Sequence, residues 1–227
     1  MENPKTYPSQ VNRQQTRLRE LFKYPELHND AIQLFLHQHA MLHSKAVTNQ
    51  EPWSMEDEVF MGLDEAGVRR VAEGAEHSIA WLIWHVARCE DITMNLLVAV
   101  SPQVLLGGGW LEKLRINIRD TGNLMTPAEI NSFSDGIDIG ALREYHAAVG
   151  RRTQAIVKDL THADIKRKPP ADRIQRVWDE GAVLPGADSI VNYWSKRTTA
   201  GLLLMPASRH LILHFNEAMD LRKKLGK

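Results

Sequence analysis

The segment of residues 77–100, HSIAWLIWHVARCEDITMNLLVAV, constrains the fold more than any other part of the sequence. Drawn as a helix, it is apolar on nearly every side, which is typical of a helix surrounded by other elements. At roughly 100° per residue, its few polar side chains share an arc of about 120°. They are His77, His85, Arg88, Asp91 and Asn95. We therefore predict a central buried helix with a single polar strip.

Further long segments also show helical spacing of apolar side chains. Apolar residues return at three- and four-residue steps from about Leu27 to Ala46 and from about Ile139 to Leu160. Ser189 to Leu204 and Pro206 to Leu225 read as two helical stretches joined or kinked at Pro206, because proline interrupts a helix but suits its first turn. Four long helices without sustained β alternation predict an all-α four-helix bundle, in which facing helices can build a site.

The rest of the sequence predicts extra short helices and an N-terminal extension. The TPAE segment of residues 126–129 has the pattern of a capping box, so a short helix is expected there. Another short helix is expected from Ile174 to Glu180. The extension is about 25 residues long, polar and basic. No boundary divides the chain, so we predict one domain over residues 1–227 with a core of about 27–225.

Composition excludes several classes of protein. The 28 basic and 28 acidic residues balance, whereas a nucleic-acid footprint needs an excess of Lys and Arg on one face. The first residues lack the apolar stretch of a secretory signal, and no apolar run is long enough to cross a bilayer. We expect a cytoplasmic protein with neither a nucleic-acid nor a membrane partner. Cys89 is the only cysteine, so any bound metal must be carried by histidine.

Two histidine pairs have the spacing H-x-x-x-H, which brings both rings to one side of a helix. They are His39 with His43 and His210 with His214. In a chain with ten histidines this spacing alone is weak evidence, so the availability of a third ligand decides. His85, in the most buried helix, is the best candidate, because an imidazole there needs a partner. The residues alone leave two interpretations open: His85 binds a metal, or it hydrogen-bonds across the bundle.

WLIWHVARCED in the second long helix, together with RHLILHFNEAMDLRKK near the C-terminus, resembles the DinB-like superfamily of helical bundles. This superfamily includes bacillithiol- and mycothiol-dependent transferases and isomerases. The resemblance implies a divalent metal held by His85, His210 and His214, an external low-molecular-weight thiol, and a homodimer. Zinc, nickel and iron all suit imidazole ligands, so the metal is open among them.

Other polar residues near these motifs have ordinary interpretations. His39 and His43 match no ligand of the superfamily, and we expect them on a polar helix face or at a pocket rim. His77 and Arg88 either orient a substrate anion or pair with nearby groups such as Asp91, and we favour the pairing.

Further expectations concern the tryptophans, the cysteine and the carboxylates near the two histidine motifs. Trp81 and Trp84 are expected in the core, with a pocket wall as the alternative. We expect Cys89 to be a small buried hydrophobic residue, since nothing nearby argues for a lowered thiol pKa. Glu217 and Asp91 are candidates for carboxylates that fix the tautomer of a metal ligand. No catalytic residue can be named.

Two chemistries fit an open three-histidine metal site acting on a small-molecule substrate. One is transfer to a metal-activated thiol, which the resemblance favours, and the other is hydrolysis by metal hydroxide. We therefore predict a metal-dependent transferase or hydrolase. The alternative is a non-catalytic bundle, with or without metal, that serves as an interaction or dimerisation module. A fourth protein ligand at the metal would favour that alternative, because structural zinc sites are closed.

Overall fold

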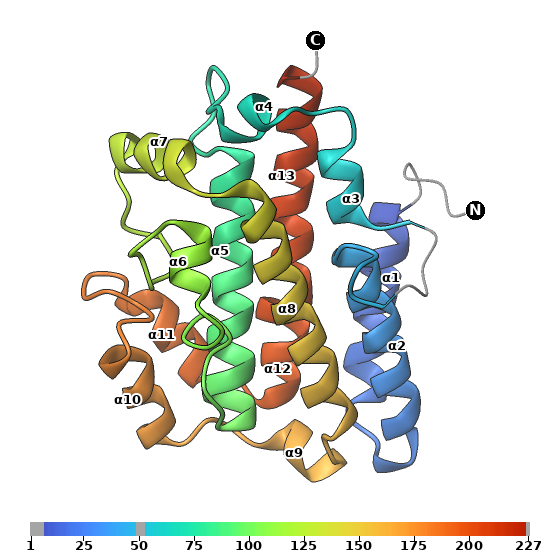
Figure 1. Ribbon diagram of the computed structural model, residues 1–227. Coiled ribbons are helices and arrows are strands. Elements are labelled where there is room, and N and C mark those ends of the chain that lie inside the picture. Colours follow the sequence, from blue (N-terminus) through green and yellow to red (C-terminus); the bar gives the residue numbers. More distant parts are fainter. Residues whose placement is uncertain (1–6, 49–52, 226–227) are drawn as a thin grey trace.

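The computed structural model describes residues 7–48 and 53–225 of the chain. Within these ranges the protein consists of helices and loops, without a strand (Figure 1). None of the described helices is long and apolar enough to cross a membrane. The predicted all-α fold is confirmed.

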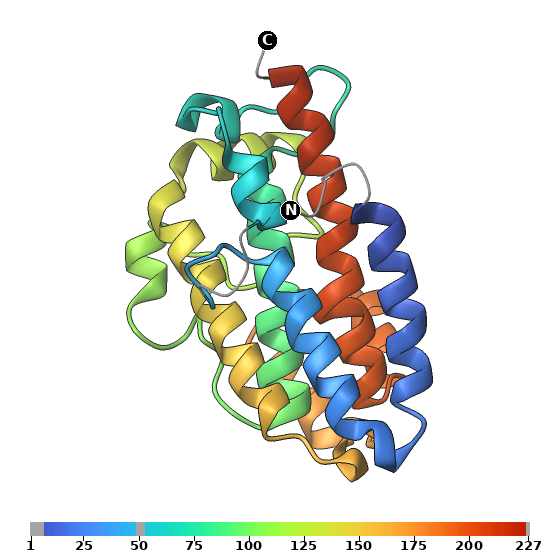
Figure 2. The same ribbon diagram turned by 90° about the vertical axis from the view of Figure 1, so that its right-hand side faces the viewer.

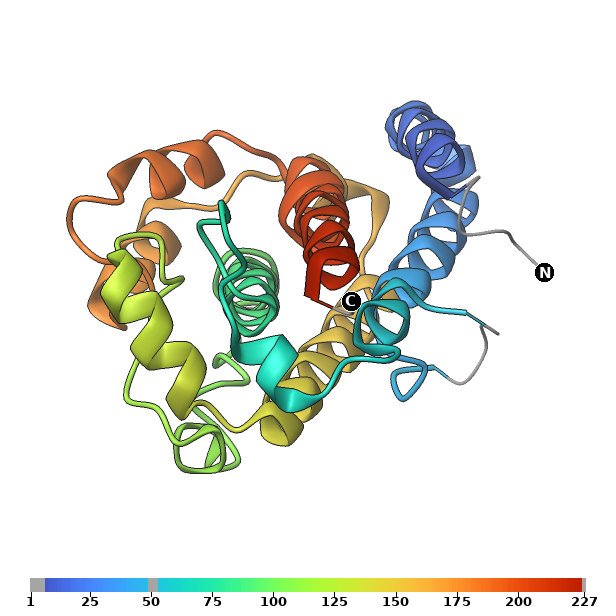
Figure 3. The ribbon, with the colours of Figure 1, turned by 90° about the horizontal axis from the view of Figure 1, so that it is seen from above.

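Four helices form the bundle, with α5 at its centre. They are α2 (His28–Leu42), α5 (Ile79–Asp91), α8 (Ile139–Lys158) and α13 (His210–Leu225). Helix α8 packs on α5 and α2, and α13 packs on α5. All residues of α5 are buried, and Figure 3 shows this helix enclosed by its neighbours. The sequence prediction of a buried central helix in a four-helix bundle is therefore confirmed.

A further helix, α1 (Tyr7–Leu21), lies on the outside of the bundle beside α2 (Figures 2 and 3). The sequence analysis predicted an N-terminal extension here but did not predict that it forms a helix. Val11, Leu18 and Leu21 are buried at helical spacing, but Gln15 interrupts the apolar stripe. The Gln15 side chain donates to Gln38 Oε1 at 2.6 Å and to Ser208 Oγ at 2.9 Å. At position 15, these buried hydrogen bonds therefore take the place of the apolar packing that the neighbouring positions of the helical stripe provide.

The bounds of the long helices differ from the predicted ones at their ends. A 3₁₀ turn, η1 (Pro25–Leu27), leads into α2, which ends at Leu42 because His43 has extended backbone angles. The predicted end at Ala46 was too late. Helix α5 is continued by the π-helical segment η2 (Ile92–Ala99), so the chain remains helical over most of residues 77–100. Val100, in the left-handed region at φ 52°, terminates it.

The C-terminal region is interrupted twice. The predicted helix from Ser189 to Leu204 is two helices, α11 (Asp188–Ser195) and α12 (Thr199–Leu204), and the Thr198 side chain caps the second. The predicted interruption at Pro206 is confirmed, since a π-helical turn, η3 (Met205–Arg209), separates α12 from α13. This turn places His210, the first residue of α13, opposite His85 of α5.

Short helices decorate the connections between the long ones. The predicted capping box is present at Thr126, where Thr126 and Glu129 satisfy each other's backbone donors. The predicted helix around Ile174 is also found. The short helices are α3 (Met55–Phe60), α4 (Glu65–Arg69), α6 (Trp110–Leu114), α7 (Pro127–Gly136), α9 (His162–Lys166) and α10 (Ala171–Asp179).

Arg88 organises a buried network on the polar strip of α5. Its guanidinium donates to Asp91 at 2.9 Å, to the Tyr145 hydroxyl at 2.8 Å and to Gln103 at 2.5 Å. It also donates to the backbone carbonyl of Arg119 at 2.6 Å and 3.0 Å. Because Arg88 is fully buried and fully paired, it does not face a substrate anion, and the expected pairing with Asp91 is confirmed.

Candidate metal centre

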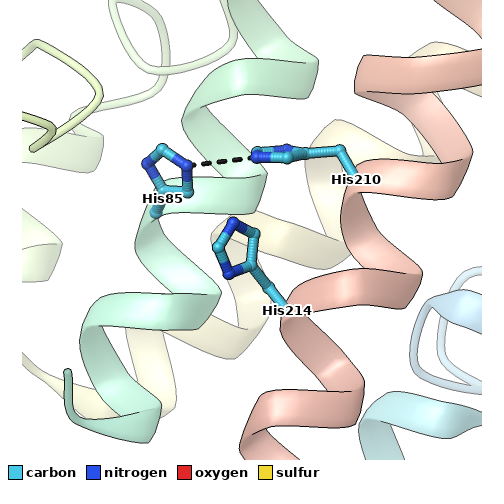
Figure 4. Close-up of side chains that lie close together, drawn as sticks. All are labelled: His85, His210 and His214. Carbon is cyan, nitrogen blue, oxygen red and sulfur yellow. Dashed lines mark hydrogen bonds between the residues drawn. The ribbon is translucent and has the colours of Figure 1, made fainter. Parts of the chain in front are cut away.

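Three histidines from two facing helices converge beside the core, as Figure 4 shows. His85 projects from α5, and His210 and His214 occupy consecutive turns of α13. The Nε2 atoms of His85 and His210 are 3.2 Å apart. One ring nitrogen of each histidine lies within 4.8 Å of the others. The structure therefore brings together the three residues that the sequence motifs singled out.

Hydrogen bonds on the far side of two rings fix their tautomers. Nδ1–H of His85 donates to the backbone carbonyl oxygen of Thr121 at 2.7 Å, and Nδ1–H of His214 donates to Glu217 Oε2 at 3.1 Å. In a neutral ring the Nε2 atom then carries a lone pair. For His85 and His214 this lone pair is available to bind a cation, as second partners of this kind arrange for metal ligands.

The nitrogen spacing fits a divalent metal. Two imidazole ligands of tetrahedral zinc, each with a bond of about 2.0–2.1 Å, have nitrogen atoms about 3.3 Å apart. The observed 3.2 Å between His85 Nε2 and His210 Nε2 is close to that separation. Among the described residues, the buried Nδ1 atom of His210 has no hydrogen-bond partner. Hydrogen bonding within the protein therefore leaves the His210 ring without a full set of partners.

The rings of His85 and His210 are held in the neutral form. Burial, together with the charge of the nearby His214, lowers the pKa of His85 to about 3. Burial likewise holds the pKa of His210 well below its ordinary value, with His85 and His214 as further causes. Neutral imidazole is the form that binds a metal, so neither His85 nor His210 has to lose a proton first at neutral pH.

The metal-free protein is expected to lose stability as the pH falls below about 6.5. Unfolded His85 takes up a proton near that ordinary value, whereas folded His85 does so only near its lowered pKa of about 3. The unfolded state therefore binds more protons between the two values. The melting temperature in the presence of a chelator measures this loss. A His85→Leu variant should show a shallower dependence, and equal slopes for the two proteins would contradict the assignment.

Glu217 accepts hydrogen bonds from His77 and from His214 of the candidate metal centre. Its Oε1 accepts from His77 Nδ1 at 3.2 Å while its Oε2 accepts from His214. Hydrogen bonds from His214 and His77 lower the pKa of Glu217 to about 2, so it is ionised at neutral pH. We expected Glu217 and Asp91 as carboxylates that fix the tautomer of a metal ligand. Glu217 has the geometry for this role, because it accepts a hydrogen bond from His214. The expectation was wrong for Asp91, which instead accepts hydrogen bonds from Arg88 and other groups of the buried network.

A stack of parallel rings holds His85 in place. The Trp81 ring lies between the rings of His77 and His85, at centroid distances of 3.9 Å and 4.7 Å and with interplanar angles of 13° and 6°. His77 therefore pairs with Glu217 and stacks on Trp81. Trp84 points elsewhere, into the core against Phe133 and Tyr145.

A cavity of about 230 Å³ opens beside His85 and His210. Its wall is mainly apolar and aromatic, with Tyr193 and Trp194 from α11 and Met205 from the π-helical turn. Sequence reasoning missed this wall, because the pattern of α11 does not reveal what it faces. Thr121 was missed for another reason: it acts through its backbone carbonyl, which any residue could supply.

Cys89 also lines the cavity, with Sγ 3.9 Å from His85 Nε2. Burial raises the pKa of its thiol to about 12. The expectation of a buried, unactivated cysteine is therefore confirmed, although its position at the cavity was not foreseen.

His39 and His43 are not near this centre. Both side chains are fully buried, and their Nε2 atoms lie 2.8 Å and 3.0 Å from the Glu90 carboxylate. The expectation of a polar helix face or pocket rim was wrong, because the carboxylate of the central helix gives both rings a partner inside the core.

The fold and the site together define a helical bundle with a candidate three-histidine metal centre. Residues 50–217 match the family model of the DinB superfamily, so the chain belongs to that superfamily. The match covers about three quarters of the chain and includes His85, His210 and His214. A search of curated proteins found no match.

Proposed function

We propose that this protein is a divalent-metal-dependent enzyme that transfers a low-molecular-weight thiol to a small electrophilic substrate. His85, His210 and His214 hold the metal, which is zinc, nickel or iron. The observation that carries the proposal is the convergence of three imidazole nitrogens, two of which belong to the cavity-lining residues His85 and His210. The superfamily resemblance supports it, because that resemblance implies metal ligands at these same three positions.

The ligand set favours catalysis over a structural role. Among the described residues, the group of metal-binding side chains around these nitrogens contains the three histidines and no fourth His, Cys, Asp or Glu. Structural zinc sites are closed by four protein ligands, whereas catalytic sites leave a position for water or substrate. Since His85 and His210 line the cavity, a metal held by these residues would be accessible to a substrate bound there.

Each part of the site has a role in this chemistry. A divalent metal held by His85, His210 and His214 would lower the pKa of a bound thiol or water and would stabilise developing negative charge. Glu217 and the Thr121 carbonyl keep two of the ligand rings in the required tautomer. The apolar wall of Tyr193, Trp194 and Met205 binds an apolar part of the substrate and excludes water from the reacting atoms.

The thiol comes from outside the chain. Cys89 is the only cysteine, and its raised pKa keeps it protonated at neutral pH. In the proposed reaction the external thiol loses its proton and its sulfur bonds to the electrophilic carbon. The leaving group departs with the electron pair of the broken bond. In an isomerisation, the same thiol adds to the substrate and is released again.

Glu217→Gln is expected to weaken zinc binding at this centre by about 10–100-fold, as loss of a carboxylate behind a ligand histidine does. The neutral amide is a weaker acceptor for His214 and His77. Competition with a chromogenic chelator measures the affinity. Glu58→Gln is the matched control, because Glu58 pairs with Arg222 away from the centre. Equal affinities of the two variants would argue against the role of Glu217.

The proposal is tested by metal removal. Protein stripped with a chelator and protein reloaded with zinc, nickel or iron are incubated with a panel of low-molecular-weight thiols and electrophiles, and conjugates are detected by mass spectrometry. We expect conjugation that is lost on stripping and restored on reloading. Turnover of an ester or amide without thiol would instead favour hydrolysis. Metal-independent behaviour throughout would favour the interaction module.

We also propose, on the resemblance alone, that the chain forms a homodimer. Size-exclusion chromatography with light scattering measures its mass in solution, and a monomer at all concentrations would contradict this.

A further inference from the structure

A second group of ionisable side chains lies inside the bundle, away from the three-histidine centre. We call it the buried His–Glu cluster. It consists of His39 and His43 from the end of α2, Glu56 from α3, Glu90 from α5 and His146 from α8. The exposed fraction of each is 0%. Five ionisable groups sealed together are costly unless their charges and hydrogen bonds are satisfied.

The Glu90 carboxylate joins the two histidines of α2. Its Oε1 lies 2.8 Å from His39 Nε2, and its Oε2 lies 3.0 Å from His43 Nε2. The two imidazole rings are 4.3 Å apart. One ring nitrogen of each histidine and one oxygen of Glu90 lie within 4.8 Å of one another, and nitrogen and oxygen donors are those that zinc takes in proteins.

The central helix thus offers a third ligand to both H-x-x-x-H pairs of the chain. His85 faces His210 and His214, and Glu90, five residues later, faces His39 and His43. Five residues correspond to a rotation of about 140° around a helix, so the two groups lie on different sides of α5. The criterion that separates a metal site from a chance pair, a third ligand within reach, is met on both sides.

Hydrogen bonds within the cluster do not satisfy all of its members. Within the described ranges, His39 Nδ1, His43 Nδ1, His146 Nε2 and Glu56 Oε1 are buried without a hydrogen-bond partner. None of these four atoms is one of those that the Glu90 hydrogen bonds join, and each costs free energy while it stays buried and unpaired.

The donor atoms of the cluster suit a divalent cation. Two carboxylates, Glu56 and Glu90, and three imidazoles lie together with an exposed fraction of 0%. Carboxylate oxygens and imidazole nitrogens are ligands that zinc takes in proteins, and a divalent ion would offset the charge of buried carboxylates.

Arg143 offsets only part of the charge of the Glu56 carboxylate. Arg143 Nη2 lies 2.8 Å from Asp57, while Arg143 Nε is 3.7 Å from Glu56 Oε1. Its charge is therefore shared with a further carboxylate outside the cluster. Gly150 of α8 allows the close packing, since a Cβ at that position would lie 2.7 Å from His43 Nδ1.

We propose that the buried His–Glu cluster binds one divalent cation of the zinc type, held by His39 Nε2, His43 Nε2 and both oxygens of Glu90. Each ring keeps one proton, which moves from Nε2 to Nδ1 when the ion binds. Glu56 and His146 lie behind this site and complete the charge balance. All five side chains of the cluster are buried, so a substrate cannot reach the ion. The ion is therefore structural, and it links α2 to the central helix α5.

This ion would join a segment that lies outside the superfamily match to helices that lie inside it. His39 and His43 precede the matched residues 50–217, whereas Glu56, Glu90 and His146 lie within them. The site would therefore attach the N-terminal helices to the part of the bundle that matches the superfamily.

The test uses the full chain expressed with added zinc, so that the ion can enter during folding. We expect about two zinc ions per chain in the wild type, about one in His214→Ala and none in His214→Ala combined with Glu90→Gln. His214→Ala combined with Glu180→Gln, the matched control, should keep one. The zinc retained by His214→Ala should resist a chelator and show imidazole and carboxylate ligands by X-ray absorption.

The His214→Ala protein alone keeps the proposal falsifiable if the Glu90→Gln variant does not fold. Folded His214→Ala protein without zinc would overturn it and leave the cluster as an ion-pair network. The outcome is separate from that of the proposed function, because failure of the three-histidine centre would instead leave the zinc content of wild type and His214→Ala equal.

Discussion

Arg88→Met is expected to destabilise the protein by about 3–5 kcal/mol, the cost of removing one partner from a buried ion pair. The methionine fills much of the space but leaves the Asp91 carboxylate without its cation. It also frees the Arg119 carbonyl, which anchors the loop that carries Thr121 to His85. The midpoint of urea unfolding measures the change in the free energy of unfolding.

Arg176→Met provides the control for this variant. Arg176 pairs with Glu180 at 2.6 Å in a partly exposed position, where an ion pair contributes about 0–1 kcal/mol. If Arg88→Met cost no more than this control, the buried network would not be what holds α5 to the loop around Thr121.

His85→Leu is expected to remove the metal from the three-histidine centre and to lower thiol-transfer activity by about 1,000-fold or more. This magnitude corresponds to the several kcal/mol of transition-state stabilisation that a catalytic metal supplies. The folded state should persist, because leucine suits a position that is only 4% exposed. Activity is measured with the thiol and electrophile identified by the metal-removal screen, and folding by circular dichroism.

His162→Leu is the matched control, since His162 is partly exposed on α9 and belongs to no metal-binding group in the described part of the chain. It should retain wild-type activity. Activity of His85→Leu within about 10-fold of the wild type would mean that His85 contributes less than about 1.4 kcal/mol to the transition state, which contradicts metal catalysis at this site.

Several elements could be predicted because one local signal decided each of them. The apolar circumference of residues 77–100 required burial, the Thr126 capping box started α7, and Pro206 interrupted the C-terminal helices. The approach of His85 to the His210 and His214 pair followed from motif resemblance, since the residues alone left hydrogen bonding as an equal alternative.

Other features depended on tertiary contacts that no local pattern encodes. Helix α1 was missed because Gln15 occupies a buried position and is satisfied only by groups far along the chain. His39 and His43 were placed at a surface because the carboxylate that pairs with both of them lies 47 or more residues away. In both cases polar side chains are buried because distant partners satisfy them.

The zinc content of the wild type and of His214→Ala, measured side by side by inductively coupled plasma mass spectrometry on tag-free protein, tests the central claim most directly. The three-histidine centre predicts that the variant holds about one zinc ion fewer per chain than the wild type. Equal zinc contents in the two folded proteins would contradict it.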